Sequence, residues 1–159
     1  MITRFLKGLL VSLLITLSLQ TTQAAEIDGS NQLLMMRSKQ SFPEAMLSLQ
    51  TTLVDYGYTI SRVQRIDIGL TGMGYNTDKY RVLFFTKPNE FRETIKKHPK
   101  LTAYLPLKLT IFAENDETII ATIDPLVLQF IVDSAEFNLL TRRWHSDIVA
   151  IMDELREID

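Results

Sequence analysis

The sequence of 159 residues contains no cysteine and two histidines, His98 and His145. Without cysteine the chain can form no disulfide and carries no thiol for catalysis or for lipid attachment. The two histidines lie far apart in the chain and do not form the closely spaced pair that supplies ligands to zinc. We therefore expect no metal site and no other cofactor.

The chain also lacks an excess of positive charge. It has 17 Lys and Arg residues against 19 Asp and Glu residues, and its formal net charge is −2. A mildly acidic domain binds nucleic acid and anionic lipid poorly, because both require a basic surface that releases counterions. The composition therefore argues against a nucleic-acid partner and against a lipid surface as partner.

No apolar run reaches the roughly 20 residues that a membrane-spanning helix requires. An apolar run of about a dozen residues, at positions 8–19, follows the positive residues Arg4 and Lys7 and precedes small residues that end at Ala24. This arrangement is typical of a secretory signal peptide. The sequence predicts a signal peptide at residues 1–24, cleavage near Ala25, and a periplasmic or secreted protein without stable membrane insertion. A polar leader at residues 25–32 would precede a single domain at residues 33–159.

Within this predicted domain, apolar residues either alternate or recur at helical spacing. Alternation predicts strands at residues 33–39, 59–70, 79–86, 107–113 and 118–123, and the acidic turn 114–117 closes a hairpin between the last two. Helical spacing predicts helices at residues 42–56 and 90–97 and from residue 135 onward, with a short helical turn at 126–132. The order β-α-β-β-α-β-β-α indicates an α+β domain with one antiparallel sheet and helices packed mainly on one face.

Two of the predicted helices have recognisable start signals. Ser41-Phe42-Pro43-Glu44 has the form of a capping box, in which a serine hydroxyl and a glutamate carboxylate each bind a backbone amide. Asp133-Ser134-Ala135-Glu136 has the same form before the final helix. Trp144 lies at the centre of the apolar stripe of that helix, and we expect it to be buried and to anchor the helix against the sheet.

Three features of the chain together resemble a known family. They are Leu105-Pro106 followed by the predicted hairpin and Asp124-Pro125, the strand that contains Phe84-Phe85, and the short helix after Pro88. Over residues 33–125 the sequence resembles the DUF302 family of uncharacterised domains. The resemblance implies a curved antiparallel sheet backed by helices, related to one half of the TATA-binding protein and often dimeric, with no established activity. Many members have a Cys-Asn-Pro-like turn where this chain has Thr86-Lys87-Pro88-Asn89, so a thiol-based function is not expected.

Strict alternation along the strands predicts which side chains point away from the helices. The residues expected under the helices are Ile66, Tyr80, Val82, Phe84, Leu107, Leu109, Ile111, Ile119, Ala121 and Ile123. The outer face would then carry five candidate binding residues, Arg65, Arg81, Phe85, Lys108 and Phe112. Bases and aromatic rings gathered on one sheet face favour self-association, a partner protein or a small-molecule ligand.

Two classes of function remain open. The first is a non-enzymatic domain that binds a second copy of itself, a partner protein or a small molecule through the outer sheet face. The alternative is an enzyme, a hydrolase or an isomerase, in which Asp67 and His145 form an acid–base pair. A pocket that holds these two side chains within hydrogen-bond distance would favour the enzyme, and a flat apolar surface would favour association.

Overall fold

The computed structural model describes residues 32–157, so the predicted signal peptide and nearly all of the predicted leader lie outside the described residues. Five strands form one antiparallel sheet in the order β1-β5-β4-β3-β2. They are β1 (Leu33–Ser38), β2 (Thr59–Arg65), β3 (Tyr80–Thr86), β4 (Leu107–Glu114) and β5 (Glu117–Ile123). The predicted α+β class with one antiparallel sheet is confirmed.

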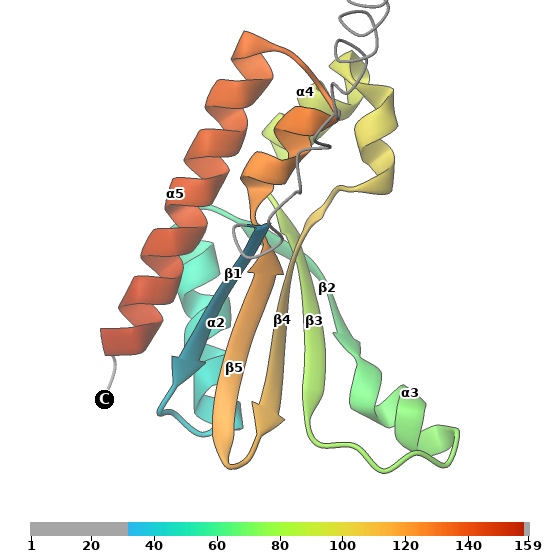
Figure 1. Cartoon of the computed structure of the whole chain (residues 1–159), viewed down its shortest axis with the longest axis vertical. Helices are drawn as coiled ribbons and strands as arrows, with labels where there is room; N and C mark the ends of the chain where they lie inside the picture. The colour runs from blue at the N-terminus through green and yellow to red at the C-terminus, as the bar shows by residue number, and fades with distance from the viewer. Residues whose placement is uncertain (1–31, 158–159) are drawn as a thin grey trace, which may run out of the picture.

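Two long helices cover one face of this sheet. They are α2 (Phe42–Asp55) and α5 (Ala135–Glu157), and Figure 1 shows α2 behind the strands and α5 alongside β1. The shorter elements α4 (Pro88–Lys97), η2 (Pro99–Ala103) and η3 (Pro125–Phe130) gather at one end of the sheet, and α3 (Ile66–Gly72) projects at the other (Figure 1). Within residues 32–157, none of the helices combines the length and the apolar character needed to cross a membrane.

The hydrophobic core lies between the sheet and the two long helices. Its fully buried side chains come from α2, from the central strands and from α5, and they include Leu49, Leu53, Leu83, Phe85, Leu109, Ile111, Ile148 and Ile151. Trp144 is 4% exposed, so its predicted burial is confirmed. Its ring packs edge-on against Phe137 with centroids 6.1 Å apart, and its indole N–H donates to Glu90 of α4 at 3.1 Å. Trp144 therefore also fastens α5 to α4.

The hairpin between β4 and β5 has the predicted position. Its two turn residues, Asn115 and Asp116, have φ angles of 51° and 65°. Asn and Asp tolerate this left-handed backbone, which two-residue hairpin turns require. Glu114 and Glu117 lie opposite each other beside the turn, and Arg37 of β1 binds both carboxylates, at 3.6 and 2.5 Å.

The second strand is shorter than its sequence predicts. The alternation of Ile66, Ile68 and Leu70 predicts a strand to residue 70, whereas β2 ends at Arg65 and these residues form α3. Arg65 is paired with Arg81, near the start of β3. Beyond this pair the chain has no strand opposite it, so its backbone N–H and C=O groups are satisfied within a helical turn instead.

The predicted faces of β3 and β5 are wrong. Leu83 and Phe85 are fully buried on the helix side, opposite two buried leucines of β4. Ile120 is likewise buried opposite an isoleucine of β4. Alternation could not choose between the two faces, because both alternating sets of β3 are largely apolar and neither set within Thr118–Ile123 of β5 carries a charge. The pairing with β4 and the packing of the helices decide the orientation.

Two of the predicted outer-face bases also lie on the helix side. Arg81 shares a register position with Arg65, and its guanidinium lies 5.7 Å from the ring centroid of Phe42 in α2. Lys108 and Phe112 alternate with the buried residues of β4 and lie on the face away from the helices. The five candidate residues are therefore divided between the two faces.

Candidate functional site

The sheet face turned away from α2 and α5, here called the open face, carries three rows of side chains. Strand pairing aligns each row across the sheet. The first row consists of Leu33, Ile123, Lys108, Phe84 and Arg62, and the second of Met35, Ala121, Thr110, Val82 and Gln64. The third row consists of Arg37, Ile119, Phe112 and Tyr80. Met35 is 53% exposed and Ile123 is 64% exposed. The outer face of an antiparallel sheet is usually polar where water covers it. This face is mainly apolar instead.

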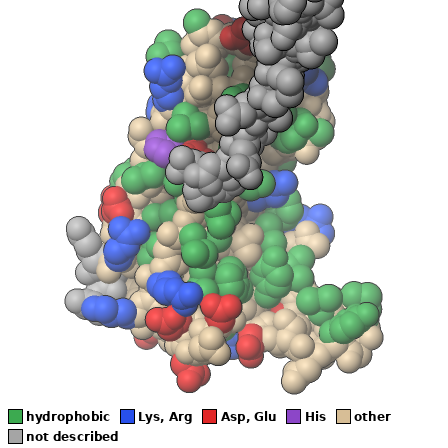
Figure 2. Space-filling model, in the orientation of Figure 1, with side chains coloured by type: hydrophobic (Ala, Val, Ile, Leu, Met, Phe, Trp, Pro, Cys, Tyr) green, Lys and Arg blue, Asp and Glu red, His purple; other side chains and the backbone are tan. Residues whose placement is uncertain are grey.

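Figure 2 looks onto the open face. Apolar side chains gather over the middle of the sheet, and a second apolar group lies on the projecting α3 region. In that region Ile68, Met73 and Tyr75 are exposed, and α3 buries none of its own residues. Apolar patches larger than a few hundred Å² are rare on monomeric proteins and mark interaction sites.

A cavity of about 420 Å³ lies at the end of the sheet where η2 and η3 are found. Residues of the sheet, of η2 and η3 and just after them line it, and it is here called the roofed pocket. Ligand pockets of proteins commonly measure about 300–1,000 Å³. The apolar part of its lining consists mainly of Val82, Tyr104, Ile123, Val127, Leu128 and Ile131. Its polar lining residues are Lys108, Thr110, Thr122 and Asp124.

The polar groups of the roofed pocket differ in their partners. The Thr122 hydroxyl donates to the backbone oxygen of Lys108 at 2.5 Å. Asp124 accepts a hydrogen bond from the backbone N–H of Leu126 at 2.9 Å. Lys108 is exposed, and its ammonium forms no ion pair with any residue from 32 to 157. The pocket therefore has one uncompensated positive charge at its wall.

His145 is held by Asp124, a pairing that the sequence did not indicate. Its Nδ1 lies 2.9 and 3.0 Å from the two carboxylate oxygens. The Asp124 side chain is 7% exposed and that of His145 is 32% exposed. A buried carboxylate that orients a histidine in this way can position a base. In the sequence, Asp124-Pro125 contributes only to the family resemblance. The role of the Asp124 side chain depends on α5, which brings His145 against it.

Asp67, the predicted partner of His145, lies elsewhere. Its carboxylate binds Arg81, with both side chains largely buried at the base of α3. The hydrogen bond from Arg81 lowers the pKa of Asp67 below its usual value. This ion pair fixes α3 to β3, and the predicted Asp67–His145 pair is wrong.

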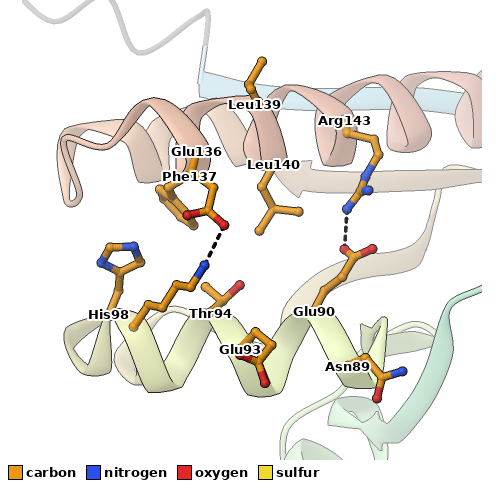
Figure 3. A pocket seen from close by; sticks show the side chains of 11 residues that line it. Asn89, Glu90, Glu93, Thr94, His98, Glu136, Phe137, Leu139, Leu140 and Arg143 are labelled. Atoms are coloured by element: carbon orange, nitrogen blue, oxygen red, sulfur yellow. Dashed lines mark hydrogen bonds and ion pairs between the residues drawn. The ribbon is translucent and has the colours of Figure 1, made fainter.

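A second cavity, of about 480 Å³, lies between α4 and α5. Figure 3 shows two ion pairs across it, Lys97 with Glu136 and Glu90 with Arg143, each at 2.6 Å. The hydrogen bond between the first two lowers the pKa of Glu136 and raises that of Lys97. His98 ends α4, and its ring centroid lies 5.7 Å from that of Phe137. Four of the charged groups lining this groove, Lys97, Glu136, Glu90 and Arg143, are already paired across it, so it has the character of a helix–helix contact.

A third cluster joins α5 to the start of α4. Asp147 accepts hydrogen bonds from the Tyr58 hydroxyl at 2.8 Å and from the Lys87 ammonium at 2.9 Å. Lys87 also lies 4.6 Å from the centroid of the Tyr58 ring. Burial and the neighbouring carboxylate raise the pKa of Tyr58, so this phenol is unsuited to act as a nucleophile near neutral pH. Among the described residues, no group of three or more His, Cys, Asp and Glu side chains is suited to hold a metal ion.

The fold, a five-stranded antiparallel sheet with helices packed on one face, is shared with a solved structure. This is the "crystal structure of uncharacterized conserved protein DUF302 from Bacillus stearothermophilus", which matches with a TM-score of 0.72 and 18% sequence identity over 78% of this chain and 98% of that one. The family described as "Domain of unknown function DUF302" matches residues 34–155. The chain therefore belongs to the DUF302 family. The matched segment includes α5, beyond the residues 33–125 that carried the resemblance. No curated protein matches the sequence.

Proposed function

We propose that this chain is a non-enzymatic association domain whose open face binds a second copy of the chain. The observation that carries the proposal is the apolar character of the open face. Leu33, Met35 and Ile123 are each at least half exposed there, although each would be more stable in an apolar environment. A second open face supplies such an environment, as in the self-complementary interface of a two-fold dimer.

The size of the surface supports a dimer. Five strands, spaced about 4.8 Å apart and about seven residues long at about 3.3 Å per residue, give a footprint of about 550 Å². Stable interfaces bury about 800 Å² on each partner. Side-chain relief increases the accessible area above the footprint, and the exposed apolar residues of the α3 region add to it. The open face and α3 together thus approach the required size.

The enzyme alternative has less support. Asp67 is engaged by Arg81, and His145 by Asp124. An Asp–His pair activates a nucleophile only if a hydroxyl or thiol lies against the other ring nitrogen. Among residues 32–157, no serine, threonine or tyrosine hydroxyl is hydrogen-bonded to the His145 ring.

Sedimentation velocity over a concentration series tests the proposal. We expect the wild-type chain to form dimers and the double variant Leu33→Glu/Met35→Glu to remain monomeric. Both side chains point outward from the edge strand β1, so the folded chain should tolerate the substitutions. In a two-fold interface the four added carboxylates would face one another or an apolar surface, which costs several kcal/mol.

A matched control carries the same substitutions on the helices. Leu47 of α2 is 66% exposed and Leu139 of α5 is 69% exposed, and both lie away from the open face. The variant Leu47→Glu/Leu139→Glu should dimerise like the wild type, and circular dichroism should show all three proteins folded. A wild-type chain that is monomeric throughout the series, or a control variant that dissociates as readily as the β1 variant, would refute the proposal.

A further inference from the structure

We propose that the roofed pocket binds an amphipathic monoanion, an unbranched apolar chain that ends in a carboxylate, of the fatty-acid class. The pocket lies at one end of the open face, but it is formed within one copy of the chain. It combines an apolar cavity with a single uncompensated cation.

The lining of the cavity favours an apolar ligand. Its lining combines Val82 and Ile123 of the sheet with Val127 of η3 and with Ile131, which follows η3. Tyr104, just after η2, lies at the same end of the sheet. An apolar chain between these walls removes both its own surface and theirs from water, which is the main source of affinity in such pockets. The volume of about 420 Å³ is at the small end of the ligand-pocket range, which selects a medium-length chain.

The charges of the pocket select the sign of the head group. Lys108 lines the cavity and has no ion-pair partner among residues 32–157. Asp124 is the one acid in the lining, but its oxygens are turned to the backbone N–H of Leu126 and to Nδ1 of His145. A carboxylate can therefore bind the exposed ammonium through a charge-assisted hydrogen bond. A cationic head group would find no uncompensated acid there.

Isothermal titration calorimetry with three ligands of equal chain length tests the inference. The probes are dodecanoate, neutral 1-dodecanol and dodecyltrimethylammonium, each below its micelle-forming concentration. We expect one dodecanoate per chain, weaker binding of 1-dodecanol, and no binding of the ammonium compound. Lys108→Met should weaken dodecanoate binding at least about tenfold while leaving 1-dodecanol binding unchanged, because only the charged head group contacts the ammonium.

Two further variants give the controls. Lys100→Met removes an exposed lysine of η2 that does not line the pocket, and it should leave all affinities unchanged. Val127→Asp places a charge in the apolar wall and should abolish binding of both dodecanoate and 1-dodecanol. The monomeric variant Leu33→Glu/Met35→Glu should retain dodecanoate binding, which separates this inference from the proposed dimer. Absence of dodecanoate binding to the wild type, or equal losses in Lys108→Met and Lys100→Met, would overturn it.

Discussion

Replacing Trp144 tests how the final helix is held. Trp144→Ala removes a side chain that is 4% exposed and in edge-on contact with Phe137. Truncating a buried tryptophan or phenylalanine to alanine costs about 3–5 kcal/mol, a large share of the roughly 5–15 kcal/mol that stabilises a domain. Trp144→Phe keeps an aromatic ring but loses the hydrogen bond to Glu90. Because Glu90 keeps Arg143 at 2.6 Å, no carboxylate is left unpaired, and we expect a cost of about 1–2 kcal/mol.

Urea unfolding followed by circular dichroism measures these differences, since the chain has a single tryptophan and both variants lose its fluorescence. The measurements should be made at several protein concentrations, because dimerisation makes the apparent stability concentration-dependent. Leu139→Ala, at a side chain that is 69% exposed on the same helix, is the control and should change the free energy of unfolding by less than about 0.5 kcal/mol. A cost below about 1 kcal/mol for Trp144→Ala, or equal costs for the alanine and phenylalanine variants, would refute this account of the docking.

Two further predictions concern an ion pair and a helix end. The pKa of Asp67 is lowered in the folded chain by Arg81, so the pair contributes stability above the unfolded pKa of about 3.9 and loses it as the pH falls through the lower folded value. Asp67→Asn should therefore reduce the free energy of unfolding at pH 7. In urea titrations at decreasing pH, the difference in free energy of unfolding between the variant and the wild type should disappear. A difference that stays constant with pH would contradict the stabilising role of the Asp67–Arg81 pair. Gly57 ends α2 with φ +79°, so Gly57→Ala should reduce the free energy of unfolding by about 1 kcal/mol. Gly69 lies in α3 with open space around it, and Gly69→Ala should increase the free energy of unfolding by up to about 1 kcal/mol. Thermal unfolding of the Gly57→Ala and Gly69→Ala variants measures both effects. Equal effects would contradict the argument that the positive φ of Gly57 is what makes alanine unfavourable there.

Local signals predicted most of the secondary structure. The carboxylate of Glu44 accepts a hydrogen bond from the backbone N–H of Ser41 at 3.0 Å, as the capping box predicts. The second predicted box does not form in the same way. α5 begins at Ala135, and Glu136 binds Lys97 of α4 instead of the backbone. A capping residue can be diverted by a partner from another element, and the sequence near the helix does not contain that partner.

The candidate site was harder to predict, because its parts come from distant segments. The roofed pocket needs η2 and η3 to fold over the end of β3, β4 and β5, and no single segment contains its pattern. Asp124 and His145 meet because α5 packs back over the end of the sheet. Both residues are visible in the sequence, but the sequence does not show that Arg81 occupies the carboxylate of Asp67 and so removes it as a partner for His145.

The error in the strand faces has a physical cause that bears on function. In β4 one alternating set is Leu107, Leu109 and Ile111 and the other contains Lys108, so the two faces are chemically distinct and were predicted correctly. In β3 both sets are largely apolar, a pattern typical of strands that are covered on both faces, and in β5 the second set, Thr118, Ile120 and Thr122, is uncharged. In this chain the helices cover only one of those faces. The same apolar pattern that prevented a correct choice of face is what the proposed dimer requires, because in it a second copy of the chain would cover the open face.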